Sequence, residues 1–211
     1  MSALPRIVCL GYSGNALEMF DHLRRVFRVA AFLDDNPDLA GHSFRDVPVL
    51  PMGALNQFDD AQVVVTFGSQ RSIGVRAAVV ARLGIARDRF ATVLHPAAHV
   101  SSQAWIGAGT MIFPGAVVTH NARIGDHCMI LPNSVVHHDV ELDDHVLVGS
   151  NVTIAGHCRI GSGCYLGSAS SFMNGVTVSP GSVIGMAANV IRDVPAGSVM
   201  IGNPARPLSG A

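Results

Sequence analysis

The stretch that decides the fold reads VVTHNARIGDHCMILPNSVVHHDVELDDHVLV, at residues 117–148. Within it an aliphatic residue stands at every sixth position, beginning with Val118 and ending with Val148. The period extends outward to Val100 and Val190, and all sixteen positions that it visits hold an aliphatic residue or Phe. A small or compact side chain stands four residues after each of them. So long a period is a specific structural signal, which composition alone does not produce.

A period of six matches neither an amphipathic helix nor a two-sided strand, whose side chains repeat about every 3.6 and every two residues. It matches short strands joined by regular turns, three to a coil, with one large and one small residue facing inward on each strand. Such coils stack as a parallel β-solenoid, in which each coil is buried against its neighbours. Glycine often follows the aliphatic position, where we expect a turn with unusual backbone angles; these glycines are Gly107, Gly125, Gly149, Gly161, Gly167 and Gly185.

The balance of charges argues against a nucleic-acid partner. The 211 residues hold 14 Lys and Arg against 15 Asp and Glu, a net charge of −1, whereas proteins that bind nucleic acids neutralise phosphates with Lys and Arg. No apolar run approaches the ~18 residues that indicate a membrane span. The apolar segment Ile7–Leu10 is too short for a signal peptide. We therefore expect a cytoplasmic protein.

The four cysteines are predicted to be buried thiols. Cys128, Cys158 and Cys164 occupy the small inward position of the repeat, and Cys9 lies in the first apolar segment. Residues so placed act as small hydrophobic side chains, and their spacing matches neither a disulfide framework nor a metal site. We expect no metal ion.

Strands and helices alternate before the repeat begins. This order predicts a small parallel α/β domain of Rossmann type at residues 1–90, followed by the solenoid at residues 91–211. The predicted strands are Arg6–Leu10, Arg28–Leu33, Val47–Leu50 and Gln62–Phe67, with helices at Asn15–Val26 and Ile73–Leu83 and an edge strand at Ala91–Leu94.

Ligands of such domains bind at the loops that follow the strands. A glycine turn before a helix suits a phosphate, so we expect Gly11, Ser13 and Gly14 to bind one, with Gly68 contributing from a neighbouring loop. A purely structural turn is the other interpretation of these glycines. Asp34 and Asp35 follow the second strand and could accept hydrogen bonds from a base or ribose, or serve only as turn residues.

The order of these parts resembles a known family. The likeness rests on Leu94-His95-Pro96, Asn121–Asp126 (NARIGD), His138-Asp139 and Gly202–Arg206 (GNPAR), in a Rossmann-like domain followed by an uninterrupted hexapeptide solenoid. The chain resembles the hexapeptide-repeat, left-handed β-helix bacterial sugar acyltransferases. These include sialic-acid O-acetyltransferases and nucleotide-linked amino-sugar N-acetyltransferases of the bacillosamine and perosamine type. The first turn departs from the family's usual Gly-x-Gly-Gly-His, because residues 11–15 read GYSGN.

The resemblance implies a left-handed β-helix and a reaction. The expected activity is transfer of an acetyl group from acetyl-CoA, the co-substrate, to the amine of a nucleotide-linked 4-amino-4,6-dideoxy sugar. Transfer to an amine or a hydroxyl needs a base, and imidazole titrates in a suitable range. The family places its base in a His-acid pair, which corresponds to His138 with Asp139. It assigns the oxyanion to a backbone N–H one coil further on, at Gly156, and an eighteen-residue coil places His138 and Gly156 in one column. We expect His127, His145 and His157 to be solvated turn residues.

The resemblance also implies a coenzyme groove between neighbouring solenoids. The residues that would line it are Ala155, Gly156, Gly167, Ser168, Gly185 and Met186, with Arg206 meeting a phosphate. Because a face of the solenoid must be buried and the site needs two chains, a homotrimer with three interfacial sites is expected.

Three other functions fit parts of the sequence. A sugar O-acetyltransferase of the sialic-acid type would share the fold and the base. A γ-type carbonic anhydrase would bind zinc through histidines, and His120, His138 and His157 suggest it. That site, however, needs two histidines a few residues apart in one coil and a third from another chain. A solenoid without activity, serving as a scaffold, is the remaining alternative.

Overall fold

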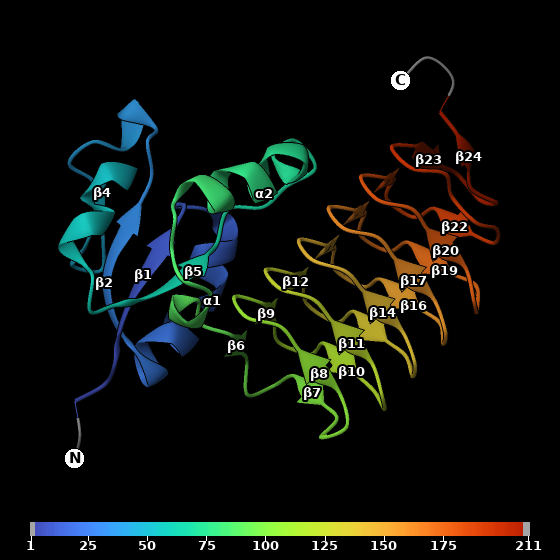
Figure 1. The fold of residues 1–211 in the computed structure, drawn as a ribbon, viewed down its shortest axis with the longest axis horizontal. Coiled ribbons are helices and arrows are strands. Elements are labelled where there is room, and N and C mark those ends of the chain that lie inside the picture. Colours follow the sequence, from blue (N-terminus) through green and yellow to red (C-terminus); the bar gives the residue numbers. More distant parts are fainter. Residues whose placement is uncertain (1–2, 209–211) are drawn as a thin grey trace.

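The computed structural model describes residues 3–208. An α/β unit lies at the N-terminal end of a long stack of coils (Figure 1). Its sheet has five strands in the order β3-β4-β2-β1-β5. The sheet is parallel except for β3, which runs antiparallel to β4. The strands are β1 (Arg6–Leu10), β2 (Arg28–Leu33), β3 (Ser43–Phe44), β4 (Val47–Leu50) and β5 (Gln62–Val65).

The helices of this unit follow the predicted order. Helix α1 begins one residue before the predicted start, because the Ser13 side chain accepts a hydrogen bond from the Ala16 N–H and caps the helix there. No helix within residues 3–208 has the length and apolarity needed to cross a membrane. The helices are α1 (Gly14–Val26) and α2 (Ile73–Arg82), with short 3₁₀ turns η1 (Pro37–Leu39), η2 (Met52–Gln57) and η3 (Arg87–Arg89).

The coils have three strands each, as predicted, and form three flat faces. The first face contains β6 (Val93–Leu94), β9 (Met111–Ile112), β12 (Met129–Ile130), β15 (Leu147–Val148), β18 (Tyr165–Leu166), β21 (Val183–Ile184), β23 (Val199–Ile201) and β24 (Arg206–Pro207). The second contains β7 (His99–Val100), β10 (Val117–Val118), β13 (Val135–Val136), β16 (Thr153–Ile154), β19 (Ser171–Phe172) and β22 (Asn189–Val190). The third contains β8 (Trp105–Ile106), β11 (Arg123–Ile124), β14 (Glu141–Leu142), β17 (Arg159–Ile160) and β20 (Thr177–Val178).

Strands one coil apart pair in parallel and in register, so that Val118 lies beside Val136 and Ile124 beside Leu142. In the described part of the solenoid, up to residue 208, only β24 reverses direction, beside β23. The stacked coils are those that the repeat predicted, and the fold is the left-handed β-helix that the resemblance implied. Three edges join the faces. In the coil of residues 129–146 the first edge spans 131–134, the second 137–140 and the third 143–146.

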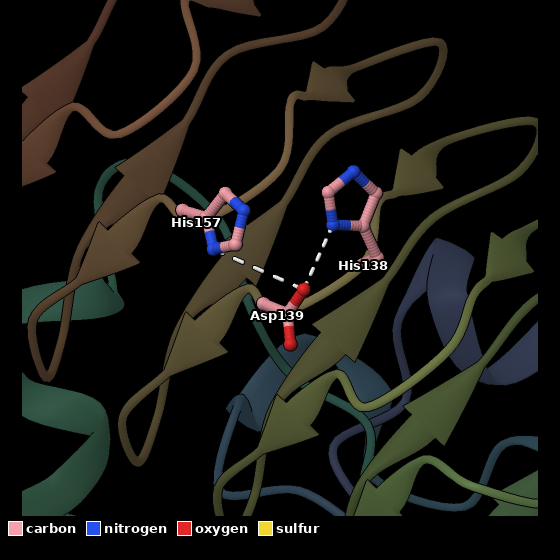
Figure 2. Close-up of side chains that lie close together, drawn as sticks. All are labelled: His138, Asp139 and His157. Carbon is pink, nitrogen blue, oxygen red and sulfur yellow. Dashed lines mark hydrogen bonds and ion pairs between the residues drawn. The ribbon is translucent and has the colours of Figure 1, made fainter.

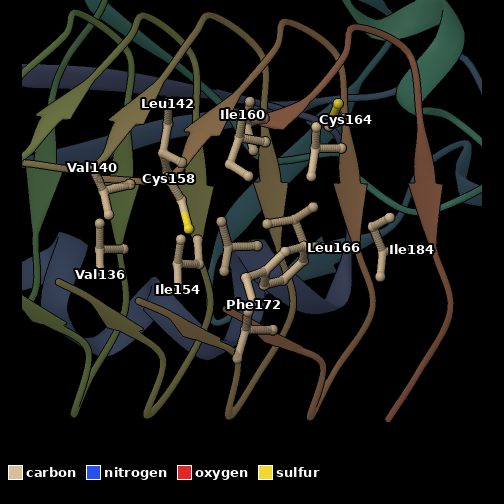
Figure 3. Close-up of a cluster of buried hydrophobic side chains, with 14 of the residues drawn as sticks. Val136, Val140, Leu142, Ile154, Cys158, Ile160, Cys164, Leu166, Phe172 and Ile184 are labelled. Atoms are coloured by element: carbon tan, nitrogen blue, oxygen red, sulfur yellow. The ribbon is translucent and has the colours of Figure 1, made fainter. Parts of the chain in front are cut away.

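The interior of the solenoid is a column of large and small side chains (Figure 3). Inward aliphatic residues such as Ile154 and Leu166 are fully buried, and so are the small-position residues Cys158 and Cys164. All four cysteines are free and buried. Burial raises the pKa of the Cys128 thiol to about 12, which keeps the thiol in its neutral form. The cysteines therefore pack as small hydrophobic residues, as predicted.

The role expected for the glycines after the aliphatic position is wrong. The left-handed backbone angles fall two residues further on, at every sixth position from Gly109 to Ala187. The glycines instead allow the next coil to approach. A Cβ on Gly125 would lie 2.7 Å from the backbone carbon of Asp143, and one on Gly167 would lie 2.6 Å from the Met186 nitrogen.

The α/β unit and the first coils share a hydrophobic core. Met111, Met129 and Leu147, on the outer side of the first face, belong to the same buried cluster as Ile7 and Phe20 of the α/β unit. The boundary expected between residues 90 and 91 stays a prediction. The chain does change partners nearby, because Phe90 bridges to Val63 of β5, whereas β6 pairs with β9.

Candidate functional site

His138 and Asp139 lie on the second edge, directly after β13. Asp139 has a φ of 58°, in the left-handed region that Asn, Asp and His adopt more readily than other side chains. Its side chain is partly exposed beside that of His138, which is half-exposed. The repeat thus places an imidazole and a carboxylate together on the outside of the coil.

The carboxylate of Asp139 orients the ring of His138 (Figure 2). The Nδ1 of His138 lies 2.8 Å from Oδ2 of Asp139. On the other side, Nδ2 of Asn121 donates to Oδ1 of Asp139 at 2.6 Å. The hydrogen bond from Asn121, followed by that of His138, holds the pKa of Asp139 below its usual range. An ionised carboxylate at Nδ1 places the proton on that nitrogen, which leaves Nε2 as the acceptor.

Gly156 lies against the ring of His138, as the column predicted. A Cβ at Gly156 would stand 2.6 Å from Cε1 of His138, so a side chain there would displace the ring. Among residues 3–208, nothing accepts a hydrogen bond from the Gly156 N–H. The three predicted catalytic residues are therefore brought together, with an open acceptor nitrogen and an unused N–H close by.

His157 also belongs to this cluster, although the sequence predicted only a solvated turn residue. Its side chain is exposed, but Nδ1 lies 3.8 Å from Oδ2 of Asp139 and its ring meets that of His138 edge-on at 5.1 Å. One ligand atom from each of His138, Asp139 and His157 lies within 4.8 Å of the others, which is close enough for the three to hold a metal ion. In this arrangement, however, Nδ1 of His138 already bonds to the carboxylate.

The residues expected to line the coenzyme groove divide between two edges of one chain. Gly167, Ser168, Gly185 and Met186 lie on the first edge, whereas Ala155 and Gly156 lie on the second. The hydroxyl of Ser168 accepts from the Ser150 N–H at 3.2 Å, and Met186 is 73% exposed. Arg206 lies on β24, where its guanidinium donates to the carbonyl of Ala205. The second face separates the two edges, so one protomer alone does not bring these residues to one place.

The first turn of the α/β unit, at residues 11–14, already packs against the loop that follows β5. Gly11 has a φ of 102°, and a Cβ there would stand 2.7 Å from that of Phe67. The Ser13 hydroxyl caps α1 and donates to the carbonyl of Thr66 at 2.8 Å. Gly14, the first residue of α1, has open space around it. Both structural and ligand roles thus remain for this turn.

The two aspartates after β2 already have backbone partners. Asp34 accepts from the N–H groups of Tyr12 and Asn36, at 2.9 Å and 3.0 Å. Asp35 accepts from the Met52 N–H at 2.8 Å. These bonds support the turn role of both residues. The same two side chains line a cleft of about 440 Å³, so the binding role stays a prediction.

His127 and His145 were both expected to be solvated turn residues. The expectation is wrong for His127, which is buried, and His145 is only partly exposed. Both lie on the third edge, under the α/β unit, and their rings stack at 5.0 Å. Phe90 meets the His127 ring edge-on at 4.4 Å. Burial, followed by repulsion from His145 and Arg76, lowers the pKa of His127 to about 4. The repeat shows only that these residues occupy turns, and not that the α/β unit covers them.

A wide hollow lies away from this site, on the third face. It has a volume of about 720 Å³ and is lined by Trp105, Asn121, Arg123, Glu141 and Asp144, among others. None of the predicted site residues lines it. It meets the site only through Asn121, which also bonds to Asp139.

Comparison with known proteins identifies the repeat. The family described as "Bacterial transferase hexapeptide (six repeats)" matches residues 103–138 and 121–156. No curated protein matches the chain by sequence.

Several solved structures match over nearly the whole chain. PerB from Caulobacter crescentus, in complex with CoA and GDP-perosamine, is 27% identical with a TM-score of 0.86, and covers 98% of this chain and 99% of its own. A variant of perosamine N-acetyltransferase from the same organism, with a histidine replaced by asparagine and in complex with the same two ligands, gives a TM-score of 0.88 at 26% identity, with 98% of each chain covered. The acetyltransferase domain of PglB from Neisseria gonorrhoeae, bound to acetyl coenzyme A, is 26% identical with a TM-score of 0.84, and covers 98% of this chain and 100% of that one.

Proposed function

We propose that this hexapeptide-repeat sugar acyltransferase is an N-acetyltransferase, which moves an acetyl group from acetyl-CoA to the amine of a nucleotide-linked 4-amino-4,6-dideoxy sugar. The observation that carries the proposal is the His138–Asp139 pair seated over Gly156. The full-length likeness to enzymes that bind CoA and GDP-perosamine supports the substrates.

His138 acts as the general base. Its Nε2 takes a proton from the sugar amine while the amine nitrogen attacks the thioester carbonyl carbon. Asp139 keeps the opposite nitrogen protonated and stabilises the imidazolium that forms. When the carbon–sulfur bond breaks, the imidazolium returns the proton to the departing thiolate. The products are the N-acetylated sugar nucleotide and CoA.

Gly156 receives the negative charge of the tetrahedral intermediate. Its N–H has no acceptor among residues 3–208, and Gly156 lies against the ring that takes the proton. A backbone donor held by the stacked coils needs no rearrangement during the reaction, which is how oxyanion sites lower the barrier.

The site is completed by a second copy of the chain in a homotrimer. One protomer supplies the second edge with His138, and its neighbour supplies the first edge with Gly167 to Met186. Both edges border the second face, so this face lies nearest the threefold axis. Its outward residues carry no Asp, Glu, Lys or Arg, which suits burial against another copy; they are His99, Val117, Val135, Thr153, Ser171 and Asn189.

The α/β unit binds the nucleotide of the acceptor. Gly11, Ser13, Gly14 and Gly68 lie around the start of α1 and the end of β5, where ligands of parallel α/β sheets bind. We place the enzyme in the cytoplasm, because its four cysteines are free thiols and such thiols are typical of a reducing compartment.

The test is an assay with acetyl-CoA and a panel of GDP-, UDP- and dTDP-linked 4-amino-4,6-dideoxy sugars. We expect one member of the panel to gain one acetyl group by mass spectrometry, with release of an equal amount of free thiol. The matched control is the same nucleotide sugar with a hydroxyl in place of the amine. Acetylation of the hydroxyl compound or of free sialic acid, but not of the amine, would overturn the proposal in favour of an O-acetyltransferase.

A further inference from the structure

Arg76, in the first turn of α2, is a buried cation at the junction between the α/β unit and the solenoid. It is 1% exposed. Its guanidinium donates to three backbone carbonyls: those of Val65 at 3.2 Å and Phe67 at 3.0 Å, and that of His127. The first two belong to the end of β5 and the loop after it, and the third belongs to the solenoid. One side chain thus ties the two parts of the molecule together.

The charge of Arg76 is balanced by backbone carbonyl groups and not by a carboxylate. Among the described residues, no carboxylate lies within ion-pair distance of it. The nearby acid Asp126 pairs with Arg87 instead. Burial lowers the pKa of Arg76 to about 10, so it stays charged at neutral pH. A buried, unpaired charge is costly, and carbonyl oxygens aimed at the guanidinium offset that cost only where their geometry is fixed.

The loop that Arg76 holds is the one expected to meet the nucleotide. On its far side, Nδ2 of Asn15 donates to the Gly68 carbonyl at 3.1 Å, and the Ser13 hydroxyl donates to that of Thr66. On its near side, a Cβ at Gly68 would stand 2.8 Å from Sδ of Met129. The loop of residues 66–68 is therefore clamped between the first turn of the α/β unit and the first face of the solenoid.

The solenoid carbonyl in this contact lies on the third edge, immediately before the coil that carries the base. From His127 the chain runs through β12 and β13 to His138 in less than one full turn. Because the coils are stacked in register, the contact fixes the position of the loop along the solenoid relative to His138. In a trimer whose axis runs along the solenoid, this relation is the same in every protomer.

We propose that Arg76 is a positioning residue, which fixes the 66–68 loop on the solenoid next to the coil of His138 and so sets where the bound sugar nucleotide places its amine relative to the base. The inference rests on the proposed function. It differs from a purely structural role in that loss of the guanidinium changes acceptor binding and leaves donor binding unchanged.

The experiment compares Arg76→Met, Arg76→Lys and Arg82→Met in the full chain. Met keeps the apolar stem without the donors, Lys keeps a charge that can reach fewer carbonyls, and Arg82 is an exposed residue of the same helix. For Arg76→Met we expect the KM for the sugar nucleotide to rise about tenfold, the loss typical of a hydrogen-bonded charged group. The KM for acetyl-CoA should stay within about twofold, and Arg76→Lys should fall between wild type and Met.

A second readout does not depend on activity. Amide hydrogen exchange of residues 66–72 should be faster in Arg76→Met than in wild type, and unchanged in Arg82→Met. If wild type transfers no acetyl group, the proposed function fails while the exchange data still decide whether Arg76 holds the loop. Unchanged exchange, or an equal rise of both KM values, would overturn the inference. If Arg76→Met does not fold, Arg76→Lys decides by the same two readouts.

Discussion

At Asp139, a φ of 58° brings the carboxylate to the outside of the coil, where its two oxygens face different partners. Oδ1 accepts from Asn121 one coil before it, and Oδ2 meets His138. The next residue in the column, His157, approaches the same Oδ2. The orientation of the proposed base is thus set by side chains from three successive coils.

Replacing His138 by Ala should lower kcat about 10²–10⁴-fold, the usual contribution of a general base. Asp139→Asn should cost less, since the imidazole survives with a weaker partner. Steady-state kinetics with the sugar nucleotide test both. His120→Ala, an exposed histidine one coil before His138 in its column, is the control. A His138→Ala enzyme with near wild-type kcat would leave the base unassigned.

His127 should make the fold sensitive to acid. Its pKa is lowered to about 4 in the folded protein, against about 6.5 in the unfolded chain. Between these values the unfolded state binds a proton that the folded state excludes, so stability is lost as pH falls from 6.5 to 4. The slope is at most about 1.4 kcal/mol per pH unit.

The His127→Asn variant, whose side chain also tolerates a positive φ, should flatten that slope in urea unfolding between pH 7.5 and 4.5. His42→Asn, at an exposed site, should not. If the free energy of unfolding depends on pH equally in wild type and His127→Asn over this range, the lowered pKa of His127 is not the cause of the acid sensitivity. His145 and His22, whose pKa values burial also lowers, should leave a smaller slope in the same direction.

Among the elements, the coil was the most predictable. The aliphatic and small positions alone predict its three strands, its inward side chains and its buried thiols, because the period reports burial directly. The positions of the turns were predicted correctly, but the reason given for the glycines beside them was wrong. The glycines next to the aliphatic position make room for the next coil, and the left-handed angle two residues later is met by Asn, Asp, His, Gly or Ala.

Two of those left-handed positions hold alanine, which strains the backbone. Ala169 has a φ of 61° and Ala187 a φ of 57°. Ala169→Gly should raise the free energy of unfolding by ~0.5–1 kcal/mol, because glycine accepts this conformation without a Cβ clash. Ala155→Gly, at a position without a positive φ, should lower it by a similar amount. Chemical denaturation of the two variants checks the pair, and loss of stability in both would refute the strain at Ala169.

In the whole molecule, the junction was the part that the sequence could not predict. The pattern shows that Arg76 lies in a helix and His127 in a turn, but not that one donates to the other across 51 residues. Nor did the pattern reveal that Met129 and Leu147, on the outside of the coil, are buried by the α/β unit. Contacts between separately patterned parts depend on surface shape, and periodicity carries no information about that shape.

Light scattering at micromolar concentration should give about three times the 22.1 kDa of one chain. The physical reason is that the two edges expected to form the site lie on either side of the uncharged second face. Val135→Arg, which places a charge on that face, should reduce the mass toward that of a monomer and abolish transfer with little change in circular dichroism. Glu141→Arg on the third face is the control. If the wild-type protein is a monomer, the proposal that two protomers together form each active site is wrong.

The attachment of the loop of residues 66–68 next to the coil of His138 has a consequence for how such a chain can change over evolutionary time. Each eighteen-residue coil adds one strand spacing, about 4.8 Å, to the length of the solenoid. A coil inserted after β18 would lengthen the groove for the donor by that step, and would leave the acceptor end and the base untouched. A coil inserted between β6 and β12 would instead disrupt the surface that the α/β unit covers. We therefore expect related chains to gain coils toward the C-terminal end. A coil added there changes the length of the donor groove and leaves the residues that bind the acceptor in place.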